Sequence, residues 1–128
     1  MKLHSTRIVT ENVPALARFY QEITGIAPDG GEDYVEFATV GEMLAISSKR
    51  ATDLYNAGAS TPASNRSLII EFEVDDVDNE RLRLKEIVKT WVMEPTTQPW
   101  GNRSMLFRDP DGNLINFFTP VSSAAIAK

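Results

Sequence analysis

The sequence predicts an α+β protein built from two copies of one unit, a strand followed by a helix and antiparallel strands. The first observation is an internal repeat: residues 5–13 (STRIVTENV) align without a gap on residues 69–77 (IIEFEVDDV), and residues 35–46 align on residues 106–117. The second is that apolar residues after each first segment recur with the period of a helix. The third is a strand–turn–strand pattern at residues 105–118. We expect the copies to pack side by side, because neither half is long enough to bury its apolar residues alone.

The first copy begins with a predicted strand at residues 3–10, which contain adjacent isoleucine and valine. Asn12 is a suitable N-cap for the helix that follows, and Gly25 is expected to end that helix. Two further strands are expected at residues 33–39 and 43–48, joined by a short glycine-containing turn.

A change of composition separates the two copies. Residues 49–66 are rich in alanine, serine, threonine, asparagine and glycine, which we interpret as a linker or a lid. The second copy opens at residues 67–74, where apolar and acidic residues alternate as in a half-buried strand. Asp76 is the expected N-cap of the next helix. Residues 92–98 are a further strand candidate, interrupted by Pro95.

The chain closes with a predicted hairpin whose turn is residues 109–113 (DPDGN). Pro110 suits the second position of a turn, and Gly112 can adopt a positive φ. Residues 99–101 (PWG) precede this hairpin. Together these residues resemble the closing hairpin of the vicinal oxygen chelate superfamily, which holds glyoxalases, extradiol dioxygenases and bleomycin resistance proteins.

The resemblance covers nearly the whole chain and implies two tandem βαβββ modules that form a curved mixed sheet around a central cavity. It implies one domain over residues 1–128. Module one would occupy about residues 1–48 and module two about residues 67–120, with the linker or lid between them and a loose tail at residues 121–128. Such a resemblance supports a fold more strongly than an activity.

The composition excludes several classes of protein. The 128 residues are 42% hydrophobic, which is enough for one domain with a core. There is no cysteine, so disulfides, zinc–thiolate sites and cysteine nucleophiles are excluded. A net charge of −5 argues against a nucleic-acid partner. No signal peptide or membrane-length apolar run is present, so we expect a cytoplasmic protein without a membrane partner.

Strand periodicity assigns each strand residue to a face. One set is expected to pack under the helices: Ile8, Leu44, Ile46, Ile70, Phe72, Val74, Ile115 and Phe117. The opposite set is expected to line the cavity that the resemblance implies: Ser5, Arg7, Val9, Met43, Ala45, Ser47, Ile69, Glu71, Glu73, Leu114, Asn116 and Phe118. Mixed apolar and polar linings of this kind are usual in small-molecule pockets.

The resemblance also implies where a metal ion would be held. In the superfamily's metalloenzymes, His and Glu occupy four positions, which fall here on Ser5, Ala45, Ile69 and Asn116. The middle two have no donor atom, and the outer two offer only neutral oxygens, so we expect neither a metal ion nor another cofactor. His4 would enter the cavity only through a one-residue shift of register that turns Ile8 away from the helix, at a cost of about 1.5–3 kcal/mol.

The candidate ligand-binding residues come from the cavity-facing set and from the hairpin: Ser5, Arg7, Ala45, Ser47, Ile69, Glu71, Trp100, Asn116 and Phe118. Trp100 is either a stacking residue at the pocket mouth or part of the core. Arg7 and Glu71 occupy equivalent places in the two copies, where they either form an ion pair or hold a polar ligand. If the protein is an enzyme, its catalytic candidates are Glu71 or Glu73 as the base and Arg7 as the group that stabilises an anion.

We expect metal-independent binding of a small organic molecule, similar to the bleomycin-resistance branch, whose members sequester a drug as homodimers. A homodimer is therefore expected by resemblance. The main alternative is a divalent-metal-dependent lyase or dioxygenase, which would need His4 and carboxylates from other positions, such as Glu36 or Glu71. An enzyme without metal and a structural partner subunit are the remaining alternatives.

Overall fold

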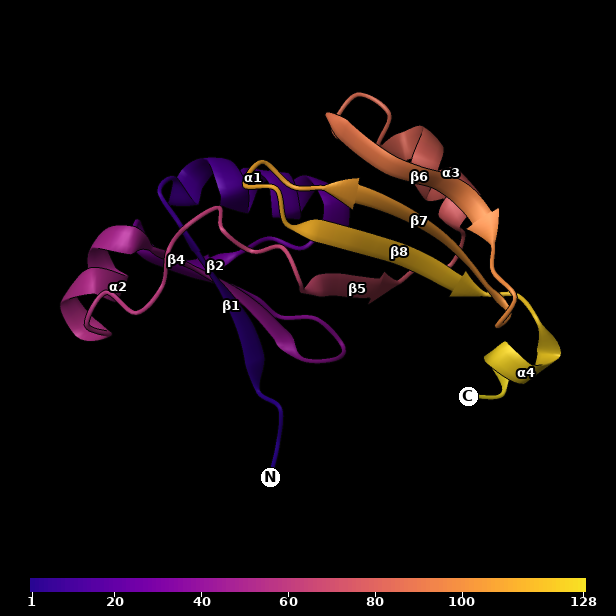
Figure 1. The fold of residues 1–128 in the computed structure, drawn as a ribbon, viewed down its shortest axis with the longest axis horizontal. Helices are drawn as coiled ribbons and strands as arrows, with labels where there is room; N and C mark the ends of the chain where they lie inside the picture. The colour runs from indigo at the N-terminus through magenta and orange to yellow at the C-terminus, as the bar shows by residue number, and fades with distance from the viewer. The chain divides into compact units, whose positions relative to one another are not determined.

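The chain divides between Asn65 and Arg66 into two units that repeat one order of elements. The computed structural model describes residues 1–128, and Figure 1 shows the elements of each unit. Each unit has a strand, a helix, three more strands and a final short helix, with its strands in a four-stranded mixed sheet. The predicted α+β class and the tandem βαβββ modules are therefore confirmed.

The first unit contains a sheet in the order β1-β4-β3-β2. Strand β1 pairs parallel with β4, and the other neighbours are antiparallel. Its elements are β1 (Ser5–Thr10), α1 (Val13–Thr24), β2 (Asp29–Gly30), β3 (Tyr34–Phe37), β4 (Met43–Ser48) and α2 (Lys49–Tyr55).

Helix α1 begins and ends at the residues that the sequence predicts. The side chain of Asn12 accepts a hydrogen bond from the Ala15 N–H at 3.1 Å, and Gly25 takes a φ of 72°, in the left-handed region that favours glycine. The apolar side of α1 packs on β3 and β4, where the rings of Tyr20 and Phe37 lie 6.4 Å apart. The large buried residues of this core are Val13, Leu16, Phe19, Tyr20, Ile23, Val35, Phe37, Leu44 and Ile46.

The second unit repeats this topology with the order β5-β8-β7-β6. Strand β5 pairs parallel with β8, and the other pairs are antiparallel. Its elements are β5 (Ile69–Glu73), α3 (Val77–Arg83), β6 (Thr90–Thr97), β7 (Asn102–Arg108), β8 (Leu114–Pro120) and α4 (Ser123–Ile126).

Aromatic rings fill the core between α3 and the second sheet. The rings of Phe107 and Phe117 lie 5.2 Å apart, and Phe72 lies 5.6 Å from Phe117. The side chain of Asp76 caps α3 by accepting a hydrogen bond from the Asn79 N–H at 3.1 Å. The buried apolar residues of this core are Val77, Leu84, Val88, Met105, Phe107, Ile115 and Phe117.

The predicted hairpin is confirmed, and Asp109 organises its turn. Its carboxylate accepts hydrogen bonds from the N–H groups of Asp111 and Asn113 at 2.9 Å, and from the Asn113 side chain at 2.8 Å. Gly112 adopts a φ of 87°, as the turn requires. Arg108 donates to the Gly112 carbonyl at 2.9 Å. The turn is thus held by side chains from both of its ends.

The structure corrects the sequence-based prediction in two segments. The predicted linker or lid begins with helix α2, which Ser48 caps by accepting a hydrogen bond from the Ala51 N–H at 3.0 Å. The predicted loose tail contains helix α4, in which Ala125 is buried. Both helices are short, so their sequences carry too few apolar residues to show a helical period.

Pro95 does not interrupt a strand, because β6 continues through it. Strand β6 lies at the edge of its sheet, where a missing N–H costs no ladder hydrogen bond. The register of the β6–β7 pair also shifts between Met93 and Thr96, which accommodates the proline.

Candidate functional site

The strand register of the first module places its candidate residues on one face. Arg7 lies opposite Ala45, which in turn lies opposite Glu36 on β3. Ser5 lies opposite Met43, one step along the same face. This face is the one opposite to α1, because Leu44 and Ile46, which alternate with these residues, belong to the core under α1. The predicted parity of these strands is correct.

A polar cluster surrounds Ala45 on this face. The guanidinium of Arg7 donates to the Asn56 side-chain oxygen at 2.9 Å, and the Tyr34 hydroxyl donates to the Glu36 carboxylate at 2.8 Å. The hydrogen bond to Glu36 raises the pKa of Tyr34 above its usual 10.0, burial raises it further, and the charge of Arg7 acts in the opposite direction. Arg7 is thus held by a residue of its own module.

Helix α2 lies over part of the same face. The hydroxyls of Ser47 and Thr52 are 3.2 Å apart, and both side chains are buried. Ala45 is also fully buried. Two of the predicted ligand-binding residues, Ala45 and Ser47, therefore lie on the predicted face but are covered.

The second module has an equivalent face. Glu71 lies opposite Asn116, which lies opposite Leu106 on β7. On either side of this row, Ile69 pairs with Leu114 and Glu73 pairs with Phe118; Ile69, Glu71 and Glu73 are exposed on the edge strand. The structure thus brings Ile69, Glu71, Glu73, Asn116 and Phe118 together, as the periodicity predicts.

Glu71 and Asn116 form a hydrogen-bonded pair on this face. The Asn116 Nδ2 donates to the Glu71 Oε2 at 2.8 Å. The other polar atom of the amide, Asn116 Oδ1, is buried and accepts no hydrogen bond. Buried acceptors without a donor are rare and each costs about 1–3 kcal/mol, so this atom calls for an explanation.

Trp100 lies in the turn between β6 and β7 and not on a strand face. Its side chain is 65% exposed, so it belongs to no core. The turn is closed by a hydrogen bond of 2.9 Å from the Gly101 N–H to the Gln98 carbonyl. The role of Trp100 as a stacking residue stays a prediction, and the alternative of core packing is wrong.

The residues at the positions expected for a metal do not form a suitable donor set. Ser5 and Asn116 supply neutral oxygens, and Ala45 and Ile69 supply none. Nowhere in residues 1–128 do three or more His, Asp or Glu side chains gather in a geometry that could hold a metal ion. His4 directly precedes β1, is exposed, and uses its backbone carbonyl to accept a hydrogen bond from the Met43 N–H at 3.2 Å. The register shift that would turn His4 inward does not occur.

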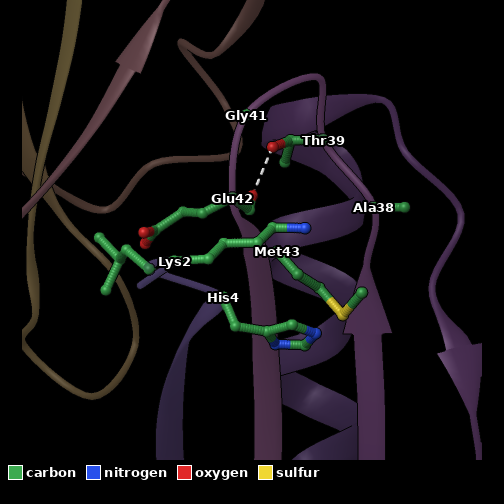
Figure 2. A pocket seen from close by; sticks show the side chains of 8 residues that line it. Lys2, His4, Ala38, Thr39, Gly41, Glu42 and Met43 are labelled. Atoms are coloured by element: carbon green, nitrogen blue, oxygen red, sulfur yellow. Dashed lines mark hydrogen bonds between the residues drawn. The ribbon is translucent and has the colours of Figure 1, made fainter.

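A shallow pocket lies beside His4 at the end of the first sheet. Its volume is about 260 Å³, and it is bounded by the N-terminal residues and the β3–β4 turn. Figure 2 shows the His4 ring beside the Met43 side chain, with Glu42 pointing away from both. Glu42 also lines the pocket, and its carboxylate accepts a hydrogen bond from the Thr6 hydroxyl at 2.6 Å.

Three residues of these faces were not among the residues assigned to a face from the sequence, although Glu36 was named as a possible carboxylate of the metal-dependent alternative. Tyr34 and Glu36 alternate with the buried Val35 and Phe37, so their parity could have placed them. Asn56 follows α2 and gives no signal in the sequence, because its contact with Arg7 depends on the fold.

The helices of this chain are all too short or too polar to cross a membrane.

Comparison with known proteins agrees with the fold described above. A family model described as the Glyoxalase/Bleomycin resistance protein/Dioxygenase superfamily matches residues 2–117. No functionally curated protein matches the chain.

Solved structures share the fold at low sequence identity. A glyoxalase/bleomycin resistance protein/dioxygenase family enzyme from Burkholderia phytofirmans PsJN is 18% identical with a TM-score of 0.82, over 94% of this chain and 100% of that one. A glyoxalase-related enzyme from Fulvimarina pelagi is 18% identical with a TM-score of 0.79, over 97% and 94%. Lactoylglutathione lyase from Agrobacterium tumefaciens is 19% identical with a TM-score of 0.68, over 92% of each chain. At these identities the likeness concerns the fold alone.

Proposed function

Since the chain belongs to the glyoxalase/bleomycin resistance protein/dioxygenase superfamily, we propose that it binds a small organic molecule without a metal ion, through candidate residues on the strand faces opposite to α1 and α3. The binding would sequester a drug or a metabolite, as in the bleomycin-resistance branch. This binding needs no metal chemistry. The alternative is a lyase or dioxygenase activity that depends on a divalent metal ion, as in other members of the superfamily.

One observation carries this proposal, namely the residue types at Ser5, Ala45, Ile69 and Asn116. A divalent ion needs anionic or imidazole donors at short, fixed distances, and these positions supply none. Neutral and apolar side chains suit an organic ligand, which gains affinity from buried apolar area and a few placed hydrogen bonds.

Sequestration is favoured over catalysis by the partners of the polar candidates. Arg7 is bound to Asn56, and Glu71 to Asn116. Arg7 shares its face with Tyr34 and Glu36, and Glu71 shares its face with Glu73, but neither Arg7 nor Glu71 is hydrogen-bonded to a second acid or base as a proton-transfer pair would be. These groups are therefore suited to hold a ligand in place.

The test is the metal content of protein purified without chelator from cells supplied with Mn, Fe, Ni and Zn. We expect far less than one ion per chain, and the chelator-treated protein should still bind members of a library of aromatic and drug-like compounds. Near-stoichiometric metal that a chelator removes, and that His4→Ala loses, would instead support the lyase or dioxygenase alternative.

A homodimer forms part of the proposal, because proteins of the bleomycin-resistance branch bind as dimers. Light scattering coupled to gel filtration measures the mass directly, and we expect about twice the 14.2 kDa of one chain. A mass of one chain at micromolar concentration would contradict a dimer while leaving ligand binding testable.

A further inference from the structure

The Glu71–Asn116 pair has a fixed direction. A carboxylate only accepts hydrogen bonds, so the amide of Asn116 must turn its NH₂ group toward Glu71, as the 2.8 Å contact shows. The Oδ1 atom is consequently directed away from Glu71. The pair therefore contains two acceptor atoms without a donor, the buried amide oxygen of Asn116 and the Oε1 atom of Glu71.

Neighbouring side chains on this face cannot supply the missing donor. The pairing places Leu106 across from Asn116, and Leu114 and Phe118 lie two residues away on the same strand. All three side chains are apolar, so none of them can donate a hydrogen bond to the buried Asn116 Oδ1. A donor must come from outside this strand face.

The charge of the face indicates which kind of donor fits. Glu71 is exposed, and Glu73 lies two residues farther along the same edge strand and is exposed as well. Two carboxylates on one edge attract a cation, whereas a metal ion would find only one carboxylate and one neutral oxygen in the pair. A protonated nitrogen instead offers several N–H donors at one centre, and charge-assisted hydrogen bonds of this kind are the stronger ones.

We infer that Glu71 and Asn116 form a recognition site for a cationic nitrogen of the ligand, in an amine, amidine or guanidinium group. The Glu71 carboxylate supplies the charge, and Asn116 Oδ1 accepts a second N–H of the same group. The apolar side chains of Leu106 and Phe118 then contact the remainder of the molecule. This inference rests on the proposed function and narrows its ligand to cationic organic molecules.

The experiment compares a cationic probe with a neutral probe of the same shape, benzamidine against benzamide. Chelator-treated protein is titrated with each by calorimetry, and the ¹⁵N-labelled protein is followed by NMR. We expect benzamidine to bind at least about tenfold more tightly than benzamide, a difference of about 1.4 kcal/mol. The side-chain NH₂ signals of Asn116, assigned from their loss in Asn116→Ala, should shift with benzamidine.

Variants separate a specific site from general electrostatic attraction. Glu71→Gln keeps the shape of the side chain and should weaken benzamidine at least about tenfold while changing benzamide little. Glu86→Gln is the matched control, because it removes the same charge from an exposed residue in the turn after α3. It should leave both affinities within about twofold.

The outcomes distinguish the two proposals. Equal affinity for the two probes, or an unchanged affinity for benzamidine in Glu71→Gln, would overturn the recognition site. Binding of neutral library compounds would in that case still support the proposed function. If neither the probes nor the library bind the metal-free protein, the proposed function itself is contradicted.

Discussion

Asn116 illustrates, at the scale of a single residue, how a position suited to binding contributes little stability. Its amide gives one hydrogen bond to Glu71 and leaves one buried oxygen without a donor. The net value of a hydrogen bond to a charged group is about 1.5–3 kcal/mol, and an unsatisfied buried acceptor costs about 1–3 kcal/mol, so the two effects largely cancel. The residue therefore contributes little stability, which agrees with the binding role that we propose for it.

This balance predicts that Asn116→Leu stabilises the protein. Leucine has nearly the same shape, removes the unsatisfied oxygen and adds apolar contact, while the exposed Glu71 can be hydrated instead. We expect the free energy of unfolding, measured in urea, to rise by about 1 kcal/mol. A loss of stability would show that the amide oxygen has a donor in solution. Asn116→Ala removes the amide without filling its volume, so it should raise the free energy of unfolding by less than Asn116→Leu does.

Single residues also mark the limit of the sequence analysis at the site. The parity rule placed Arg7, Glu71 and Asn116 on the correct faces, because alternation along a strand is a property of the backbone. It could not give the partner of Arg7, since Asn56 lies far along the chain and only the fold brings the two together. The alternation of side chains along a strand therefore assigns a residue to a face of the sheet. Only the folded structure shows which hydrogen bonds that residue makes.

At the scale of elements, helices α2 and α4 extend the internal repeat beyond the part that the sequence revealed. Each follows the last strand of its module, and each is capped by a serine, Ser48 or Ser122, that accepts a hydrogen bond from the N–H of an alanine three residues later. The alignment of the copies missed this correspondence because the helices differ in length and composition. A serine cap alone is a weak signal, so both segments were predicted as irregular.

The strands that were predicted well are those with a clear alternation or an unambiguous turn. Strand β4 was predicted with its observed bounds, and β8 follows the glycine turn as expected. The two-residue strand β2 was missed, because a segment so short has no period. The physical signal for a strand thus needs several residues.

Helix α2 should loosen in acid because its cap depends on Asp33. The Ser48 hydroxyl donates to Asp33 at 2.7 Å while accepting from the first turn of α2, and Arg50 also donates to Asp33. The Ser48 hydrogen bond and then Arg50 lower the pKa of Asp33 below its usual 3.8. A depressed pKa means that the stabilisation is complete above the ordinary value and is lost as the pH falls through the folded-state value.

The measurement is the Cα chemical shift of residues in α2 between pH 6 and pH 2. We expect helical shifts to decline below about pH 4. In Asp33→Asn they should be smaller at pH 6 and change less with pH. Because Asp78 also has a lowered pKa, owing to Arg103, the global stability will fall in acid too, and only the shifts local to α2 test this prediction. Unchanged α2 shifts in both proteins would contradict it.

Gly101 should be essential for the docking of α4. Its φ is 98°, and a Cβ added there would lie 2.0 Å from the Ser122 hydroxyl oxygen. Its carbonyl also accepts the N–H groups of Val121 and Ser122 at 2.9 and 3.0 Å. Gly101→Ala should therefore lower the free energy of unfolding by about 2–4 kcal/mol, from backbone strain and the displaced helix.

Gly41→Ala is the matched control for this prediction. Gly41 has no positive φ, and the nearest atom to an added Cβ is the Thr39 Oγ1 at 3.8 Å. Replacing Gly41 with alanine should change the free energy of unfolding by less than about 1 kcal/mol. Any change should be an increase. Urea unfolding of the two variants makes the comparison, and equal effects would mean that the contact between Gly101 and α4 is unimportant.

At the scale of the whole molecule, the predicted class and tandem modules follow from the repeat, because two copies of one pattern constrain the fold more than any single element does. The resemblance to the superfamily implies the positions at which its metalloenzymes hold their ion. The residue types at those positions give the chain its proposed difference from them. That difference can be measured as a property of the entire molecule, without identifying a ligand.

A metal site would stabilise the folded protein by linkage, so thermal unfolding tests for one. An ion that binds only the folded state at 100 times its Kd adds about 2.7 kcal/mol, which raises the Tm of a domain of this size by several degrees. We expect 1 mM Mn²⁺, Ni²⁺ or Zn²⁺, or anaerobic Fe²⁺, to change the Tm of chelator-treated protein by less than about 1 °C, because no donor set is available for a Kd near 10 µM. His4→Ala is the control for weak binding by the lone histidine. A rise of several degrees with one ion, absent in that variant, would mean that His4 is a ligand and that the metal-dependent alternative is correct.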